Sequence, residues 1–137
     1  MGKLTQRLTD AARSGVYRAQ RCDEIVDAAR GTRLDLARVD FGGAPDKEAL
    51  LERLALALGF PAWFGANWDA LEDCLSDLPG EGYVVLFENP KAGDELGILV
   101  DVLRSSAESW AGRGKPFFAV FIDPGRRLAL PDLFTEK

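Results

Sequence analysis

The amino-acid sequence predicts an α/β fold in which helices cover a small, mostly parallel β-sheet. Two observations lead to this prediction. Residues 83–87 and 117–122 form continuous apolar runs, which are typical of strands in a parallel sheet that is buried on both faces. Segments with the apolar spacing of helices alternate with the strand-like segments, as in folds built from crossover connections. After a short N-terminal helix, the predicted order is β-α-β-α-α-β-α-β.

The first part of the chain predicts a β-α extension in front of the main body. Apolar residues three and four positions apart predict a short amphipathic helix that ends before a turn at Ser14–Gly15. A brief strand is expected over 16–19. A helix is then expected over 23–30, with Gly31 just past its end. Residues 34–39 predict the next strand.

Three further helices are expected in the rest of the chain. Residues 45–59 are rich in Ala and Leu, with an aspartate cap near the start and a glycine at the end. The next helix is expected to run from Asn67, whose side chain can cap it, to the turn at Pro79–Gly80. The last covers about 94–110 and lies between the two apolar strands.

Length and composition fit one compact domain over residues 1–137, of which 47% are apolar and 28% charged. No apolar run is long enough for a signal peptide or a membrane span, so we expect a cytoplasmic protein without membrane contact. Two cysteines are too few for a disulfide scaffold or a zinc site. After residue 123 the sequence has no strong period, although its three leucines and Phe134 are expected to pack against the body.

Most enzyme chemistry is not expected in this chain. It has no histidine, which excludes the Ser-His and Cys-His nucleophile systems and the commonest general base. Residues 112–115 lack the pattern of a phosphate-binding loop and predict a turn instead. The net charge is −5 without a basic patch, so direct binding of nucleic acid is not expected. We expect no cofactor and no metal.

The helix expected after Asn67 has one acidic and one apolar face. At about 100° per residue, its polar residues fall within an arc of about 140°: Asp69, Glu72, Asp73, Ser76 and Asp77. Acidic residues three or four apart repel by roughly 0.2–0.5 kcal/mol per pair, and residues 54–90 contain six acids but no Lys or Arg. An ordinary solvated face usually mixes signs, so this face indicates a cationic partner.

Residues 63–75 carry a motif that resembles the barstar family, the intracellular inhibitors of secreted guanyl-specific ribonucleases of the barnase type. The motif is aromatic-aromatic-Gly-x-Asn-x-Asp-Ala-Leu-x-Asp-Cys-Leu, present here as WFGANWDALEDCL. The resemblance covers about 34–122. It implies a barstar-like core, with residues 1–32 as an N-terminal extension and 123–137 as a C-terminal tail.

The resemblance also implies which residues bind the partner. Asp69 and Asp73 would enter the nuclease active site and pair with the groups that hold the RNA phosphate. Trp63 would pack over the catalytic face, and Gly65 and Asn67 would shape the loop at the rim. A carboxylate can replace a phosphate oxygen pair because arginine binds either group with two hydrogen bonds. The implied partner is one barnase-like ribonuclease per inhibitor, and the free chain is expected to be a monomer.

Three positions depart from the family's founding member. Trp63 replaces a tyrosine, Glu72 replaces a tryptophan, and Ser105 aligns with an acidic contact residue, with Glu108 one turn later as a possible substitute. These departures leave open an interaction domain that kept the fold and lost nuclease binding. A second alternative is an enzyme that uses Asp69 and Asp73 as an acid–base pair, which would require a concave pocket and a raised pKa on one of them.

Overall fold

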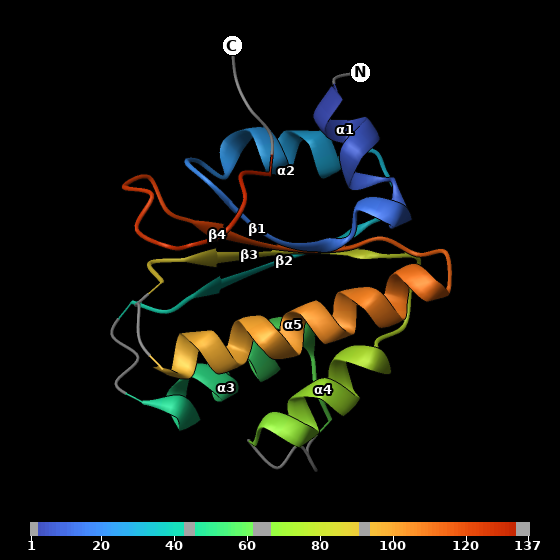
Figure 1. Cartoon of the computed structure of the whole chain (residues 1–137). Coiled ribbons are helices and arrows are strands. Elements are labelled where there is room, and N and C mark those ends of the chain that lie inside the picture. Colours follow the sequence, from blue (N-terminus) through green and yellow to red (C-terminus); the bar gives the residue numbers. More distant parts are fainter. Residues whose placement is uncertain (1–2, 43–45, 62–66, 91–93, 134–137) are drawn as a thin grey trace.

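In the part of the chain that the structure describes, four strands form one sheet, and every neighbouring pair is parallel (Figure 1). The computed structural model describes residues 3–42, 46–61, 67–90 and 94–133. The strands are β1 (Gly15–Ala19), β2 (Asp35–Asp40), β3 (Tyr83–Glu88) and β4 (Phe117–Ile122). They lie in the order β1-β4-β3-β2. The predicted α/β class and parallel sheet are therefore confirmed.

The two apolar runs in the sequence are the two central strands. All of β3 except Glu88 and all of β4 except Ile122 is buried, because helices cover both faces of the sheet. Side chains alternate along β3, so that Val84 packs on one face and Val85 on the other. The continuous apolar sequence of these strands follows from this double burial.

The helices divide unequally between the two faces of the sheet (Figure 1). One face is covered by α1 (Lys3–Leu8) and α2 (Asp23–Ala29). Three helices lie on the side of the other face, which are α3 (Lys47–Leu58), α4 (Trp68–Ser76) and α5 (Asp94–Gly112), and α4 packs against α5 (Figure 1). The larger of the two clusters of buried apolar side chains lies on this second side of the sheet. The apolar residues of α4 belong to this cluster, which leaves the opposite face of α4 at the surface.

Local capping explains where several helices begin and end. The Asp46 side chain accepts a hydrogen bond from the Ala49 amide at 3.0 Å, and Gly59 ends α3 in the left-handed conformation with φ of 67°. The predicted N-terminal helix is shorter than its apolar spacing indicates. Its α-helical part ends at Leu8, and a separate 3₁₀ turn over Ala11–Arg13 begins where Asp10 accepts from the Ala12 amide.

The C-terminal segment joins the sheet, which its aperiodic sequence does not predict. The Arg18 amide of β1 donates to the Pro131 carbonyl at 2.8 Å, and the Leu133 amide donates to the Arg18 carbonyl at 2.9 Å. Arg18 also pairs with Asp132 at 2.8 Å. The leucines expected to pack, Leu128, Leu130 and Leu133, are buried, while Phe134 lies outside the described residues. No helix in the described ranges is long and apolar enough to cross a membrane.

Candidate functional site

The acidic helix predicted after Asn67 is α4. The Asn67 side chain accepts a hydrogen bond from the Ala70 amide at 2.8 Å, so the predicted cap is confirmed. The role of Asn67 at the rim of a partner site stays a prediction. Two other predicted site residues, Trp63 and Gly65, lie outside the residues that the structure describes.

The apolar face of α4 packs against α5 and the core. Leu71 and Leu75 are fully buried, and Cys74 is buried as its position predicts. Burial raises the pKa of the Cys74 thiol, and the nearby carboxylates of Asp73 and Asp77 raise it further. Cys74 is a free thiol, as is Cys22.

Trp110 of α5 holds the backbone of α4 in place. Its indole Nε1 donates to the Leu75 carbonyl at 3.0 Å, and its side chain is fully buried. The ring meets Tyr83 edge-on, with 5.5 Å between the ring centroids. Trp110 therefore packs in the core and anchors the backbone of α4 through a buried hydrogen bond.

The opposite face of α4 presents carboxylates to solvent. Asp69, Asp73 and Asp77 are exposed, and Glu72 and Ser76 are half-buried. Among the described residues, no Lys or Arg forms an ion pair with any of these four acids. The predicted division into an apolar and an acidic face is thus present, and no described ion pair neutralises the carboxylates of the acidic face.

Two cations from a distant part of the chain lie near the C-terminal end of this helix, although residues 54–90 contain no Lys or Arg. Arg113 Nη2 donates to the Ser76 carbonyl at 3.1 Å, and Lys115 Nζ donates to the Gly80 carbonyl at 3.1 Å. Both side chains also lie over the Trp110 ring. A cation at the Ser76 carbonyl is favourable because the last carbonyls of a helix carry partial negative charge. The most strongly negative part of α4 is therefore its first two turns, with Asp69, Glu72 and Asp73.

One hydrogen bond connects the acidic face to α5. Ser105 Oγ donates to Glu72 Oε2 at 2.8 Å. The sequence gives no signal for this contact, because the two residues are 33 positions apart and lie on different helices. It joins two of the three positions that depart from the founding member's sequence.

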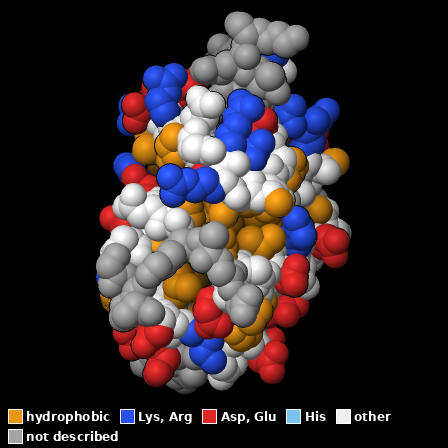
Figure 2. All heavy atoms as spheres, turned by 60° about the vertical axis from the view of Figure 1, so that its left-hand side comes forward, with side chains coloured by type: hydrophobic (Ala, Val, Ile, Leu, Met, Phe, Trp, Pro, Cys, Tyr) orange, Lys and Arg blue, Asp and Glu red, His pale blue; other side chains and the backbone are white. Residues whose placement is uncertain are grey.

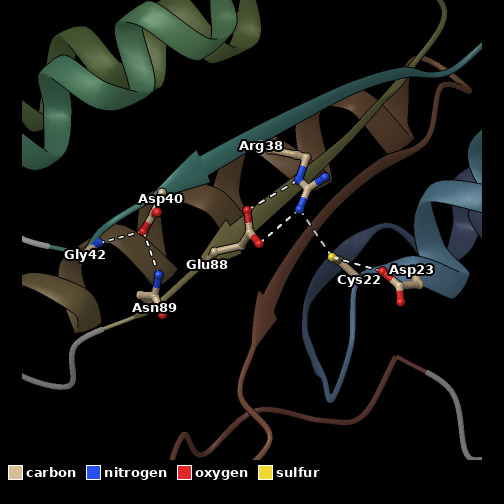
Figure 3. Close-up of polar contacts among 7 residues, drawn as sticks. All are labelled: Cys22, Asp23, Arg38, Asp40, Gly42, Glu88 and Asn89. Atoms are coloured by element: carbon tan, nitrogen blue, oxygen red, sulfur yellow. Dashed lines mark hydrogen bonds and ion pairs between the residues drawn. The ribbon is translucent and has the colours of Figure 1, made fainter.

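A second polar cluster lies where β2 and β3 end (Figure 3). Arg38 binds the Glu88 carboxylate through Nε at 3.3 Å and Nη2 at 3.0 Å. Asp40 Oδ1 accepts from the Asn89 side chain and from the Gly42 amide, both at 2.8 Å. These two hydrogen bonds, with that of Asn89 the larger effect, lower the pKa of the Asp40 carboxyl. The groups of this cluster satisfy one another, so it serves the structure of the sheet edge.

The depressions formed by the described residues lie away from the carboxylates of α4. Figure 2 shows the side of the molecule towards which the strands point, where hydrophobic side chains gather near the centre with cationic and acidic side chains around them. The two depressions that the structure describes are lined by the ends of β3 and β4, by α5 and by residues 122–130, and α4 lines neither. The described residues also contain no group of three or more potential metal ligands. This geometry gives no support to an acid–base pair formed by Asp69 and Asp73.

The self-repulsion of the acidic face predicts how one substitution changes stability. Asp73→Asn removes two repulsive pairs, Asp69–Asp73 and Asp73–Asp77, each worth roughly 0.2–0.5 kcal/mol. We therefore expect the variant to be more stable than wild type by roughly 0.4–1 kcal/mol, measured by urea denaturation. The matched control is Asp101→Asn on α5, which removes the ion pair between Asp101 and Arg104 at 3.9 Å. This control should not increase the stability of the protein. A clearly destabilised Asp73→Asn variant would show that Asp73 serves the fold.

The fold and surface together define a parallel α/β protein that carries a carboxylate-lined helix. Comparison with models of protein families matches residues 34–122 to the family described as Barstar (barnase inhibitor). The match covers more than half of the chain, and the protein belongs to this family. A comparison with individually curated proteins finds no match. The matched range begins just before β2 and ends with β4, so β1 and α2 lie outside it.

Proposed function

We propose that this protein inhibits a guanyl-specific ribonuclease of the barnase type by inserting the carboxylates of α4 into the nuclease active site. Membership in a family of barnase inhibitors supports the class of partner. The observation that carries the choice of surface is the acidic face of α4, centred on Asp69 and Asp73, which forms no ion pair with a Lys or Arg of the described residues.

The proposed mechanism is substrate mimicry by a pre-organised helix. Asp69 and Asp73 are one turn apart, so their Cβ atoms are about 5–6 Å from each other. Each carboxylate can accept two hydrogen bonds from an arginine that would otherwise hold a phosphate. Because Asn67 caps α4 and Trp110 binds its backbone, the helix needs little further ordering when it binds. Trp63 would pack over the catalytic face of the nuclease, and Gly65 and Asn67 would shape the loop at the rim.

The remaining predicted site residues are assigned to the edge of the interface. Glu72 lies between the two central aspartates in sequence but at the edge of the polar arc that faces α5, and it adds a third negative charge. Ser76 and Asp77 lie at the end of α4 that Arg113 approaches, so we expect them to contribute less. The complex would contain one inhibitor and one nuclease and would form in the cytoplasm. We propose that the free inhibitor is a monomer.

Electrostatic attraction between the acidic face and a cationic active site should accelerate association. We expect the association rate constant to fall by about tenfold or more between low and high salt, because salt screens charges separated by more than about 10 Å at 0.1 M. Stopped-flow mixing over a range of ionic strength measures this. A rate that does not change with salt would remove the electrostatic part of the proposal, even where inhibition is observed.

Inhibition itself is tested by titrating a guanyl-specific ribonuclease with the protein and following RNA cleavage. The proposal requires that cleavage stops at one equivalent of inhibitor. A protein that leaves the nuclease active and forms no complex with it would instead be an interaction domain for another partner.

A further inference from the structure

A hydrogen bond between Ser105 and Glu72 connects α5 to α4 beside the acidic face. Ser105 Oγ donates to Glu72 Oε2 at 2.8 Å, and Ser105 is exposed while Glu72 is half-buried. A glutamate on a helix surface otherwise samples several rotamers, and fixing them costs conformational entropy. The hydrogen bond from α5 therefore restricts a side chain that α4 alone would leave flexible.

The way in which Glu72 is held keeps its charge available. Ser105 is a neutral donor, and among the described residues no Lys or Arg pairs with Glu72. The other carboxylate oxygen, Oε1, accepts no hydrogen bond from the described residues. Glu72 is also on the same arc of α4 as Asp69 and Asp73. An oriented carboxylate with one free oxygen is suited to bind a guanidinium from outside the molecule.

We propose that Ser105 is a positioning residue that holds Glu72 so that its free oxygen meets an arginine of the partner nuclease. The inference rests on the proposed function and extends the binding surface from α4 to α5. In the free protein the hydrogen bond already selects the orientation of Glu72, so the partner does not have to order this side chain. Ordering one such side chain at an interface corresponds to about two- to tenfold in affinity.

The test is a double-mutant cycle between Ser105→Ala and Glu72→Ala, with affinity for the nuclease as the readout. We expect Ser105→Ala alone to weaken the complex by about two- to tenfold. In the Glu72→Ala background, Ser105→Ala should have no further effect, because Ser105 acts through Glu72. The control is Ser109→Ala, which removes an exposed hydroxyl one turn further along α5 that makes no hydrogen bond to a described residue. This control should bind like wild type.

A second readout needs no partner. Relaxation of the Glu72 methylene groups by NMR should show larger motions in Ser105→Ala than in wild type or in Ser109→Ala. Unchanged motions would overturn the inference, because the hydrogen bond would then not order Glu72.

The binding outcomes separate this inference from the proposed function. Wild-type affinity in Ser105→Ala, or no loss of affinity in Glu72→Ala, would overturn the role of Ser105 and leave inhibition through the aspartates intact. A loss in Ser105→Ala that persists without Glu72 would also overturn it, because Ser105 would then act by another route. If the wild-type protein binds no guanyl-specific ribonuclease, both proposals fail.

Discussion

Replacing Asp73 by alanine should weaken the complex with the nuclease more than any other single substitution on α4, by about 2–5 kcal/mol or more. This general range draws partly on the founding inhibitor–nuclease pair of the family. The cost is high because truncation leaves the partner's cation buried without its counter-charge. Asp73 is exposed and without an ion pair in the described structure, so its carboxylate is fully available. We expect Asp69→Ala to rank second and Glu72→Ala to have a smaller effect, an order that the family resemblance implies.

Calorimetric titration of the nuclease with each variant gives this ranking. Asp27→Ala is a suitable control, because Asp27 is an exposed acid on α2, which covers the opposite face of the sheet. It lowers the net negative charge by the same amount and should change the affinity little. An Asp73→Ala variant that binds like the Asp27→Ala control would rule out the proposed role of the acidic face.

The Trp110→Ala substitution should produce the largest loss of fold stability, about 3–5 kcal/mol. Trp110 is fully buried between Tyr83 and Phe117, so truncation leaves a large cavity. It also removes the donor that binds the Leu75 carbonyl of α4 and the ring beneath Arg113. Urea denaturation measures the loss, and a decrease below about 1 kcal/mol would show that the site collapses around the smaller side chain.

A Trp110→Phe variant separates packing from the hydrogen bond. Phenylalanine keeps most of the apolar contact but cannot donate to Leu75, so we expect a smaller loss of stability than in Trp110→Ala. The indole nitrogen is one of the groups that hold α4 in position. The folded Trp110→Phe variant should therefore also bind the nuclease less tightly than the folded wild type does. Wild-type affinity in a folded Trp110→Phe variant would show that other contacts suffice to hold α4.

The sequence predicts the main body of this fold because the signals for it are local. The apolar runs of β3 and β4, the caps at Asp46 and Asn67, and Gly59 at the end of α3 all lie within the elements that they define. The two faces of α4 follow from helical periodicity in the same way. The structure agrees with each of these predictions.

The features that the sequence does not reveal depend on contacts between distant segments. The C-terminal segment has no period, yet residues 131–133 extend the sheet beside β1. From beyond α5, Arg113 binds the last carbonyl of α4 and Lys115 binds the turn that follows it, at Gly80. Ser105 and Glu72 read in sequence as two separate departures from the family pattern, whereas in the structure they form one hydrogen-bonded pair. Periodicity cannot indicate such pairs, because it describes one element at a time.

The most direct test compares wild type with the double variant Asp69→Asn/Asp73→Asn. Measuring inhibition and stability of both proteins shows whether the acidic face of α4 serves binding to the nuclease. The double variant keeps the shape of both side chains and removes both charges. We predict that it unfolds at the same or a higher urea concentration than wild type, and that it inhibits RNA cleavage about a thousandfold less well, since each lost pair costs at least about 2 kcal/mol. A double variant that is equally stable and still inhibits as strongly as wild type would contradict the proposed function of these carboxylates.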